Sequence, residues 1–210
     1  MLAIPADYLL TAGWCLDENG QARDLILSKH CFRLCPASKH DSDEICAQIR
    51  LDDLCPSCSS RLVWLFDFSR TGLDFESLGL AEAPTTVLCC LSCACYGPVF
   101  SRYSADGTAE IVSTPEGTVA TGGSEPRTRY LSARPCPPFA CAEPFTLEDA
   151  STLGGVPMWL QDAEHPRCIE CSRYMNFIAQ HDNGPLGEEG IYYAFYCRTC
   201  RVSAVSYQQT

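Results

Sequence analysis

The chain has 210 residues, of which 46% are hydrophobic and 20% are charged, a composition typical of a globular protein. Fifteen Lys and Arg residues stand against 26 Asp and Glu residues, so the formal charge is −11, which argues against nucleic acid as a partner. No apolar run reaches the roughly 18 residues of a membrane span, and the N-terminal residues lack the pattern of a secretory signal. We therefore expect a cytoplasmic protein with no membrane partner.

The elements expected along the chain are mostly strands. Residues 43–50 favour a short helix, and Thr146 to Asp149 resembles a capping box that opens another one. Turn-forming Gly and Pro residues break the stretch 106–145 into loops and short strands. Segments rich in Val, Ile, Phe, Tyr and Leu predict antiparallel strands over Arg61–Phe68, Thr85–Leu91, Ala109–Ser113, Tyr174–Gln180, Ile191–Tyr196 and Val202–Tyr207. The predicted fold class is β-rich, α+β with little helix.

Sixteen cysteines are the most unusual feature of the composition. Eight of them form four C-x-x-C pairs: Cys55 and Cys58, Cys90 and Cys93, Cys168 and Cys171, Cys197 and Cys200. In a reducing compartment such pairs are typical of metal sites, since a thiolate binds zinc at about 2.3 Å and two pairs complete one tetrahedron. The spacing predicts two zinc ions per chain, the first on the first two pairs and the second on the last two. Four sulfur ligands leave no position for water, so both sites are predicted to be structural.

The two halves of this pattern indicate an internal repeat. When Cys55 is aligned with Cys168, the segment 58–67 falls on 171–180 without a gap, and each half continues to a second cysteine pair and a closing apolar segment. The prediction is a duplicated pair of antiparallel sheets, each with a four-cysteine zinc ribbon. The expected organisation is an N-terminal segment 1–50 packed on the first unit, a first unit 51–105, a connector 106–145 and a second unit 146–210, all in one globule.

Several alternatives stay open at the cysteines. Disulfides and buried core cysteines compete with metal binding, and Cys89 competes with Cys90 as a ligand. His30, Cys31, Cys35, His40 and Cys46 have the ligand types for a third metal, although their spacing matches no known template. The glycine often found after the second cysteine of such a turn is replaced by Ser59, Ala94, Ser172 and Arg201, which predicts backbone strain there.

No catalytic motif of the common hydrolase, metalloprotease or nucleotide-binding classes occurs in the chain. We therefore expect no catalytic residues, no cofactor-binding residues beyond the zinc ligands, and no enzyme activity. A thiol redox enzyme that uses Cys55 and Cys58 is the best catalytic alternative. His165 and His181 each lie next to an acidic residue, but isolated histidines of this kind are usually surface or core residues.

One segment resembles a known family. Leu153-Gly-Gly-Val-Pro-Met-Trp-Leu-Gln161, followed by His165-Pro-Arg-Cys-Ile-Glu-Cys171, Met175–Gln180 and Tyr207-Gln-Gln209, is similar to the signature of the bacterial YwqG-like family over roughly residues 150–208. The resemblance implies a cytosolic, β-rich bacterial protein without an assigned reaction, and the toxin-associated relatives of that family suggest an immunity protein. For Pro157 and Trp159 we favour the plainer interpretation, a packed turn beside the sheet.

The charge then suggests a partner. Two zinc sites would add −2 each, so the metal-bound chain would carry −11 − 4, about −15. We expect a basic protein partner, such as a toxin nuclease, on an acidic surface. The residues predicted to bind it are Glu143, Glu148, Asp149, Asp162, Glu164, Glu188 and Glu189. The alternative functions are a housekeeping zinc-binding adaptor and a metal store.

Overall fold

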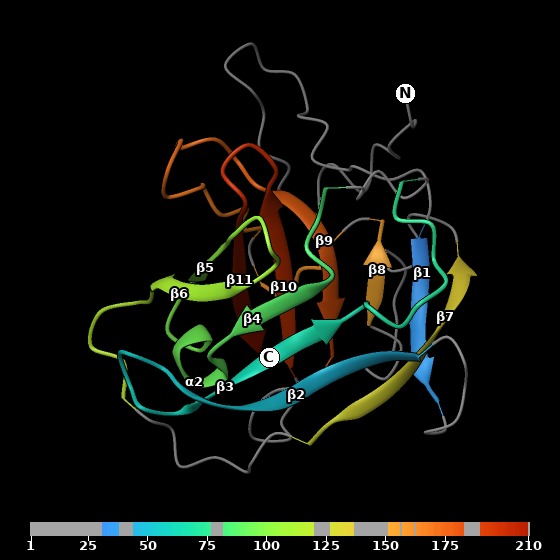
Figure 1. Cartoon of the computed structure of the whole chain (residues 1–210), viewed down its shortest axis with the longest axis horizontal. Helices are drawn as coiled ribbons and strands as arrows, with labels where there is room; N and C mark the ends of the chain where they lie inside the picture. Colours follow the sequence, from blue (N-terminus) through green and yellow to red (C-terminus); the bar gives the residue numbers. More distant parts are fainter. Residues whose placement is uncertain are drawn as a thin grey trace.

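The structure is a computed structural model that describes residues 31–37, 44–76, 82–119, 127–136, 151–155, 157–161, 163–182 and 190–209. Its elements are the strands and one short helix shown in Figure 1. They are β1 (Cys31–Pro36), β2 (Glu44–Leu54), β3 (Arg61–Asp67), β4 (Thr86–Cys89), α2 (Leu91–Ala94), β5 (Val99–Tyr103), β6 (Ala109–Ser113), β7 (Arg129–Cys136), β8 (Thr152–Gly154), β9 (Asn176–His181), β10 (Gly190–Cys197) and β11 (Val202–Gln209).

All of these strands belong to one antiparallel sheet. The order across it is β4-β3-β2-β7-β1-β8-β9-β10-β11-β5-β6. The sheet bends round, so that β2, β3 and β4 cross in front of β9, β10 and β11 in Figure 1, and β4 contacts β5, β6 and β11. The two ends of the strand order therefore lie near each other.

Strand β10 lies in the middle of the core. All of its residues are buried. Because side chains alternate along a strand, Tyr192 and Ala194 join the larger apolar cluster with β2, β3 and β4, whereas Tyr193 and Phe195 join a second cluster with Phe177. Burial on both faces explains why the segment reads as an almost unbroken apolar run.

The β-rich prediction is confirmed: the predicted strand segments contain β3, β4 and β6 and overlap most of β9, β10 and β11, which extend one or two residues further. The duplication takes a different form from the one expected, because the strands of both predicted units join a single sheet. The two closing segments, equivalent in the repeat, pair with each other: Val202 lies opposite Arg102, and Val205 opposite Val99.

The predicted helix over 43–50 is wrong, because residues 44–54 form β2. Ile45 and Ala47 are fully buried, and β2 pairs with β3 on one side and β7 on the other. Tertiary pairing therefore outweighs the helix preference of the intervening Glu, Gln and Arg residues. The other predicted helix, at Thr146, lies outside the described residues.

Within the described ranges, no helix has the length and apolar character needed to cross a membrane.

Candidate metal centres

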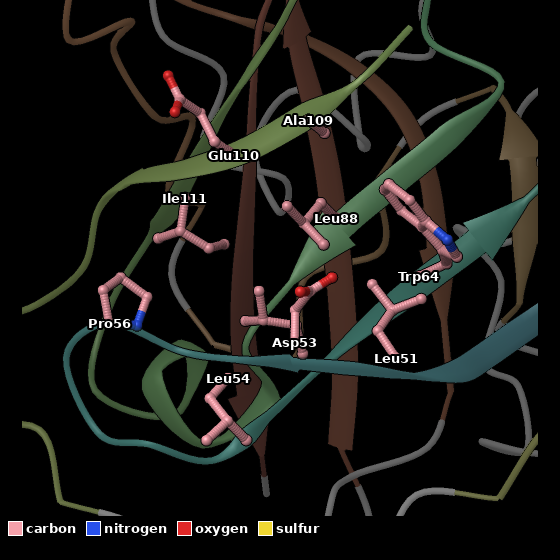
Figure 2. A pocket seen from close by; sticks show the side chains of 10 residues that line it. Leu51, Asp53, Leu54, Pro56, Trp64, Leu88, Ala109, Glu110 and Ile111 are labelled. Atoms are coloured by element: carbon pink, nitrogen blue, oxygen red, sulfur yellow. The ribbon is translucent and has the colours of Figure 1, made fainter.

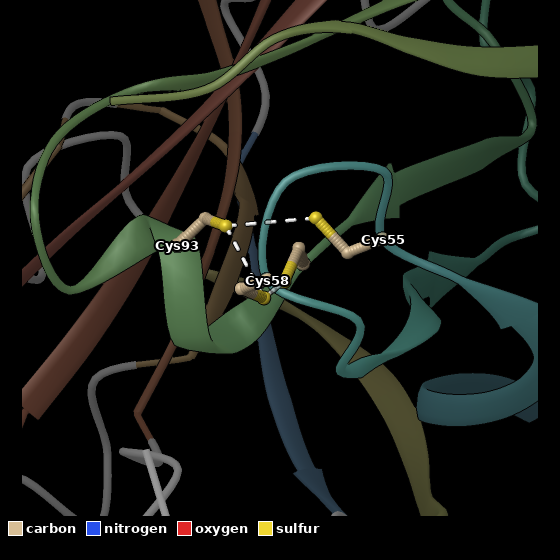
Figure 3. A group of neighbouring side chains, drawn as sticks. Cys55, Cys58 and Cys93 are labelled. Atoms are coloured by element: carbon tan, nitrogen blue, oxygen red, sulfur yellow. Dashed lines mark hydrogen bonds between the residues drawn. The ribbon is translucent and has the colours of Figure 1, made fainter. Parts of the chain in front are cut away.

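The first cysteine group joins the turn between β2 and β3 to the end of β4. Cys55 and Cys58 lie in that turn, Cys90 directly follows β4, and Cys93 lies in α2. The sulfur of Cys93 lies 3.6 Å from the sulfurs of Cys55 and Cys58 (Figure 3). The sulfur of Cys90 lies 3.5 Å from that of Cys58. All four sulfurs lie within 4.8 Å of one another.

The second group joins the segment before β9 to the turn between β10 and β11. Cys168 and Cys171 come from that segment, Cys197 ends β10, and Cys200 lies in the turn. The sulfurs of Cys171 and Cys197 are 3.7 Å apart, and all four again lie within 4.8 Å. The structure thus brings the eight predicted ligands together in two sets of four.

Both groups have the dimensions of a tetrahedral zinc–thiolate site. A regular tetrahedron with zinc–sulfur bonds of about 2.3 Å has sulfur–sulfur edges of about 3.8 Å. The contacts of 3.5 to 3.7 Å found here are close to that value. The two four-cysteine groups therefore could hold metal ions, and a zinc ion in either would have no ligand position left for water or substrate.

The backbone beside the cysteines adopts the conformation that usually requires glycine. Ser59, Ser172 and Arg201 each follow the second cysteine of a pair, and their φ angles are 60°, 57° and 55°. An L-residue in this left-handed region is strained because its Cβ approaches the neighbouring carbonyl oxygen. The predicted strain is confirmed at these positions, whereas Ala94 lies in α2 instead.

The turns at 55–58 and 168–171 also share their hydrogen bonds. The N–H of Ser59 donates to the carbonyl of Cys55 at 2.9 Å, and that of Ser172 donates to Cys168 at 2.8 Å. In each turn, the N–H of the first cysteine also donates at 2.8 Å, to the carbonyl of Ser60 in one and of Arg173 in the other. The two turns, far apart in the sequence, therefore have one local structure that directs two sulfurs toward a common point.

The thiols differ in acidity within each group. Burial raises the pKa of Cys58, but hydrogen bonds with Ser60 and the neighbouring thiols lower it more, to about 7. Hydrogen bonds from the backbone and side chain of Arg173 lower the pKa of Cys171 to about 6. Burial raises the pKa of Cys93 to about 12. Metal binding to the first group must therefore displace the proton of Cys93.

Comparisons with known proteins give a narrow result. No protein-family model matches the chain, and no solved structure matches it. The chain is similar to the uncharacterized protein YpfL of Salmonella typhimurium, with 30% identity over 228 aligned positions. The alignment covers 99% of this chain and 51% of YpfL, so the chain spans about half the length of that relative.

Cys89 lies outside the first group. Its side chain is fully buried on β4, and burial, followed by repulsion from the Cys90 and Cys95 sulfurs, raises its pKa well above the usual value. Cys90 rather than Cys89 is therefore the member of the first group.

The suggested third metal site is incomplete in the part of the chain that the structure covers. Cys31, Cys35 and Cys46 do not form a group of metal ligands there, while His30 and His40 lie outside the described residues. Cys31 instead lies opposite a cysteine of β7, Cys136.

Both discussed histidines pack against core residues. Burial lowers the pKa of His165 to about 4, and its ring lies 5.2 Å from that of Trp159. Burial, with a smaller contribution from Arg129, lowers the pKa of His181 to about 3. Neutral imidazoles are therefore expected at both positions near pH 7.

Sequence reasoning missed the polar group around His181. The hydroxyl of Ser151 lies 3.1 Å from Nδ1 of His181 and donates to the carboxylate of Asp182. The N–H of Asp182 in turn donates to the Ser151 hydroxyl at 3.1 Å. Ser151 is only 1% exposed, so the group ties the start of β8 to the end of β9 and offers no exposed nucleophile. Ser151 and His181 lie far apart in the sequence, so no local motif signals their contact.

The segment with the family resemblance is a packed turn, as the plainer interpretation predicts. Pro157 is buried, and the ring of Trp159 lies 4.7 Å from that of Tyr193. The N–H of Met158 donates to the side-chain oxygen of Gln180 at 2.8 Å, and the N–H of Leu160 donates to that of Gln208 at 3.1 Å. Two glutamines of the motif therefore hold the turn against the sheet.

Of the predicted acidic surface, the structure describes Glu164, which is exposed. The other predicted partner-binding residues lie outside the described residues: Glu143, Glu148, Asp149, Asp162, Glu188 and Glu189.

Proposed function

We propose that this chain is a zinc-stabilised protein-binding module in which both four-cysteine groups hold structural zinc. The observation that carries this proposal is the geometry of the two groups, each with its sulfurs within 4.8 Å of one another. Zinc would supply crosslinks between segments far apart in the sequence. The cysteines themselves connect the β2–β3 turn to α2, and the approach to β9 to the β10–β11 turn.

Two variants and a matched control test the structural role. Cys58→Ser and Cys168→Ser should each remove about one zinc per chain and sharply lower the melting temperature, because metal binding contributes free energy to folding. Cys95→Ser makes the same chemical change at an exposed cysteine shortly after Cys93 and should keep both metals. Ligand variants that retain the wild-type melting temperature would reject the role.

The partner we propose is a basic protein, and the finer version of this proposal is an immunity protein for a bacterial toxin. The formal charge of −11, about −15 with two zinc–thiolate sites, would attract such a partner over long distances. The resemblance of 153–161, 165–171, 175–180 and 207–209 to the YwqG-like family is the source of the immunity hypothesis.

Co-expression tests the immunity version. Genes adjacent to this one in its genome would be expressed alone and together with the chain, and growth would be measured. Restored growth for one neighbour that encodes a basic protein supports the proposal. A chain with two zinc ions that protects against none of its neighbours would favour the adaptor instead.

A further inference from the structure

The two edge strands of the sheet, β4 and β6, differ in whether their outer backbone groups have hydrogen-bond partners. At one end, Leu88 of β4 has its backbone groups satisfied by side chains of β5. Its N–H donates to the hydroxyl of Tyr103 at 3.0 Å, and its carbonyl accepts from the hydroxyl of Ser101 at 3.0 Å. This end of the sheet is therefore covered within the molecule.

At the other end, β6 pairs with β5 and is the last strand in the order. The N–H of Ser104 donates to the carbonyl of Thr108 at 2.9 Å, which fixes the alternation of the hairpin. By that alternation, the backbone groups of Ala109 and Ile111 point away from β5. In the described part of the chain no other strand pairs with them, so β6 presents an open edge.

A cavity of about 290 Å³ lies beside this edge. Figure 2 shows β6 along one side of it and β2 along the other. Most of its lining is apolar, with Leu51, Leu54, Trp64, Leu88 and Ile111 among the contributors. Leu54 is 57% exposed, which is high for a leucine in a folded protein.

The charged groups of the cavity all have one sign. Among the lining residues, only Asp53 and Glu110 carry a charge, and both are carboxylates. Asp53 makes no ion pair with any residue that the structure describes, and its carboxylate lies among the apolar side chains in Figure 2. Glu110 points away from them and lies 3.9 Å from Arg102. A cationic side chain would complement this wall.

We propose that β6 and this cavity bind an extended segment of a partner protein, which adds as a strand to β6. The segment would pair with the backbone of Ala109 and Ile111, place an apolar side chain in the cavity, and carry Lys or Arg next to it, near Asp53. This inference rests on the proposed protein-binding function and gives it a location and a class of ligand.

The first cysteine group would shape the site. Pro56, between Cys55 and Cys58, lines the cavity, and the hydroxyl of Ser57 lies 2.6 Å from that of Thr114, the residue after β6. Zinc would therefore fix one wall of the cavity and its distance from the β6 edge.

The probe is a short fluorescent peptide that alternates valine and lysine around one central leucine. Binding to the zinc-loaded full chain is measured by fluorescence anisotropy. We expect saturable binding. The affinity should fall at least about tenfold when proline replaces alternate residues of the peptide, because the peptide then lacks the N–H groups that pair with the β6 edge. Glutamate in place of lysine should also weaken binding.

Two protein variants locate the site. Ile111→Pro should abolish binding, because it removes an outward N–H of the β6 edge and a side chain that lines the cavity. The variant should still fold, because proline is tolerated at sheet edges. Asp53→Asn should weaken binding several-fold, whereas Glu76→Gln, at an exposed carboxylate outside the cavity, should not. Zinc content and melting temperature confirm that each variant is folded.

Equal binding of the proline-containing peptide, or no effect of Ile111→Pro and Asp53→Asn in folded protein, would overturn the inference. Absence of saturable peptide binding to the folded chain would also overturn it, and a dimer in light scattering would then assign the β6 edge to a second copy of the chain. Either result, with two zinc ions retained and a basic partner bound elsewhere, leaves the proposed function standing. Loss of the zinc from wild-type protein would reject the proposed function itself.

Discussion

Three residues beside the cysteine pairs have a left-handed backbone conformation, which costs stability in a residue other than glycine. Ser59, Ser172 and Arg201 hold φ angles of 60°, 57° and 55° that suit glycine, and each lets a cysteine turn close. Strain of this kind is of the order of 1 kcal/mol per residue.

Ser172→Gly should therefore stabilise the zinc-bound protein by about 1 kcal/mol and raise its melting temperature by about 2–4 °C. Calorimetry would measure the change. The matched control is Ser113→Gly in β6, where an extended backbone makes glycine destabilising. A lower melting temperature for Ser172→Gly would show that the turn is not strained.

Outside the two groups, Cys136 is a cysteine of the described ranges whose pKa is lowered. A hydrogen bond with Cys31 lowers its pKa to about 7, with burial opposing and the charge of Arg33 assisting. In contrast, the sulfur of Cys95 is partly buried although the residue as a whole is exposed, and this burial raises its pKa.

Because the thiolate is the reactive form, the alkylation rate of Cys136 should rise as pH increases through 7 and level off above it. Pulse labelling of the zinc-loaded protein with iodoacetamide and mass spectrometry would follow both cysteines, and Cys95 should react slowly at pH 7.5. Cys31→Ala should move the Cys136 midpoint upward. An unchanged midpoint would contradict the assigned cause.

Among the elements, β4 and β5 form the contact that closes the sheet. The Tyr103 hydroxyl accepts from the N–H of Leu88 and lies 3.3 Å from the hydroxyl of Ser203, so it joins β4, β5 and β11.

Tyr103→Phe should destabilise the chain by about 1–3 kcal/mol, because it leaves a buried N–H without a partner. Urea denaturation would give the difference. Tyr96→Phe, at a tyrosine that is 49% exposed, is the control and should be close to neutral. Equal midpoints for the two variants would show that the β4 edge is satisfied in another way.

The elements predicted from the sequence were those whose own residues determine them. Strands β9, β10 and β11 follow from apolar runs, and the cysteine turns follow from their spacing. The sequence predicts a helix over 43–50, where β2 forms instead, because β2 depends on pairing with β3 and β7, which are separate segments of the chain. The short strand β8 is absent from the predicted strands, and it pairs with β1 and β9, which are distant segments of the chain.

The candidate metal ligands could also be predicted, because they lie in short sequence motifs, whereas the cavity could not, because distant segments form it. Each cysteine turn is a short motif, and the alignment of the two repeat units selects Cys90 over Cys89. The cavity depends on the way the sheet bends, which brings Ile111 of β6 near Trp64 of β3. No periodicity in either segment encodes that approach.

For the whole molecule, the net charge of −11 gives a prediction about association with the proposed basic partner. The association rate should be high at low salt and fall as the Debye length shortens from about 30 Å at an ionic strength of 0.01 M to about 8 Å at 0.15 M. The dissociation rate should change less. Charge reversal at Glu143, Glu148, Asp149, Asp162, Glu164, Glu188 and Glu189 should slow association without loss of zinc. Stopped-flow rates that are insensitive to salt and to these reversals would favour the adaptor role.

We propose that zinc in two four-cysteine groups holds this bent sheet together. Elemental analysis of the chain, purified under reducing conditions without added metal, tests it most directly. We expect two zinc ions per chain, bound by Cys55, Cys58, Cys90 and Cys93 and by Cys168, Cys171, Cys197 and Cys200. A folded, soluble chain without metal, or one whose eight cysteines are paired in disulfides, would contradict it.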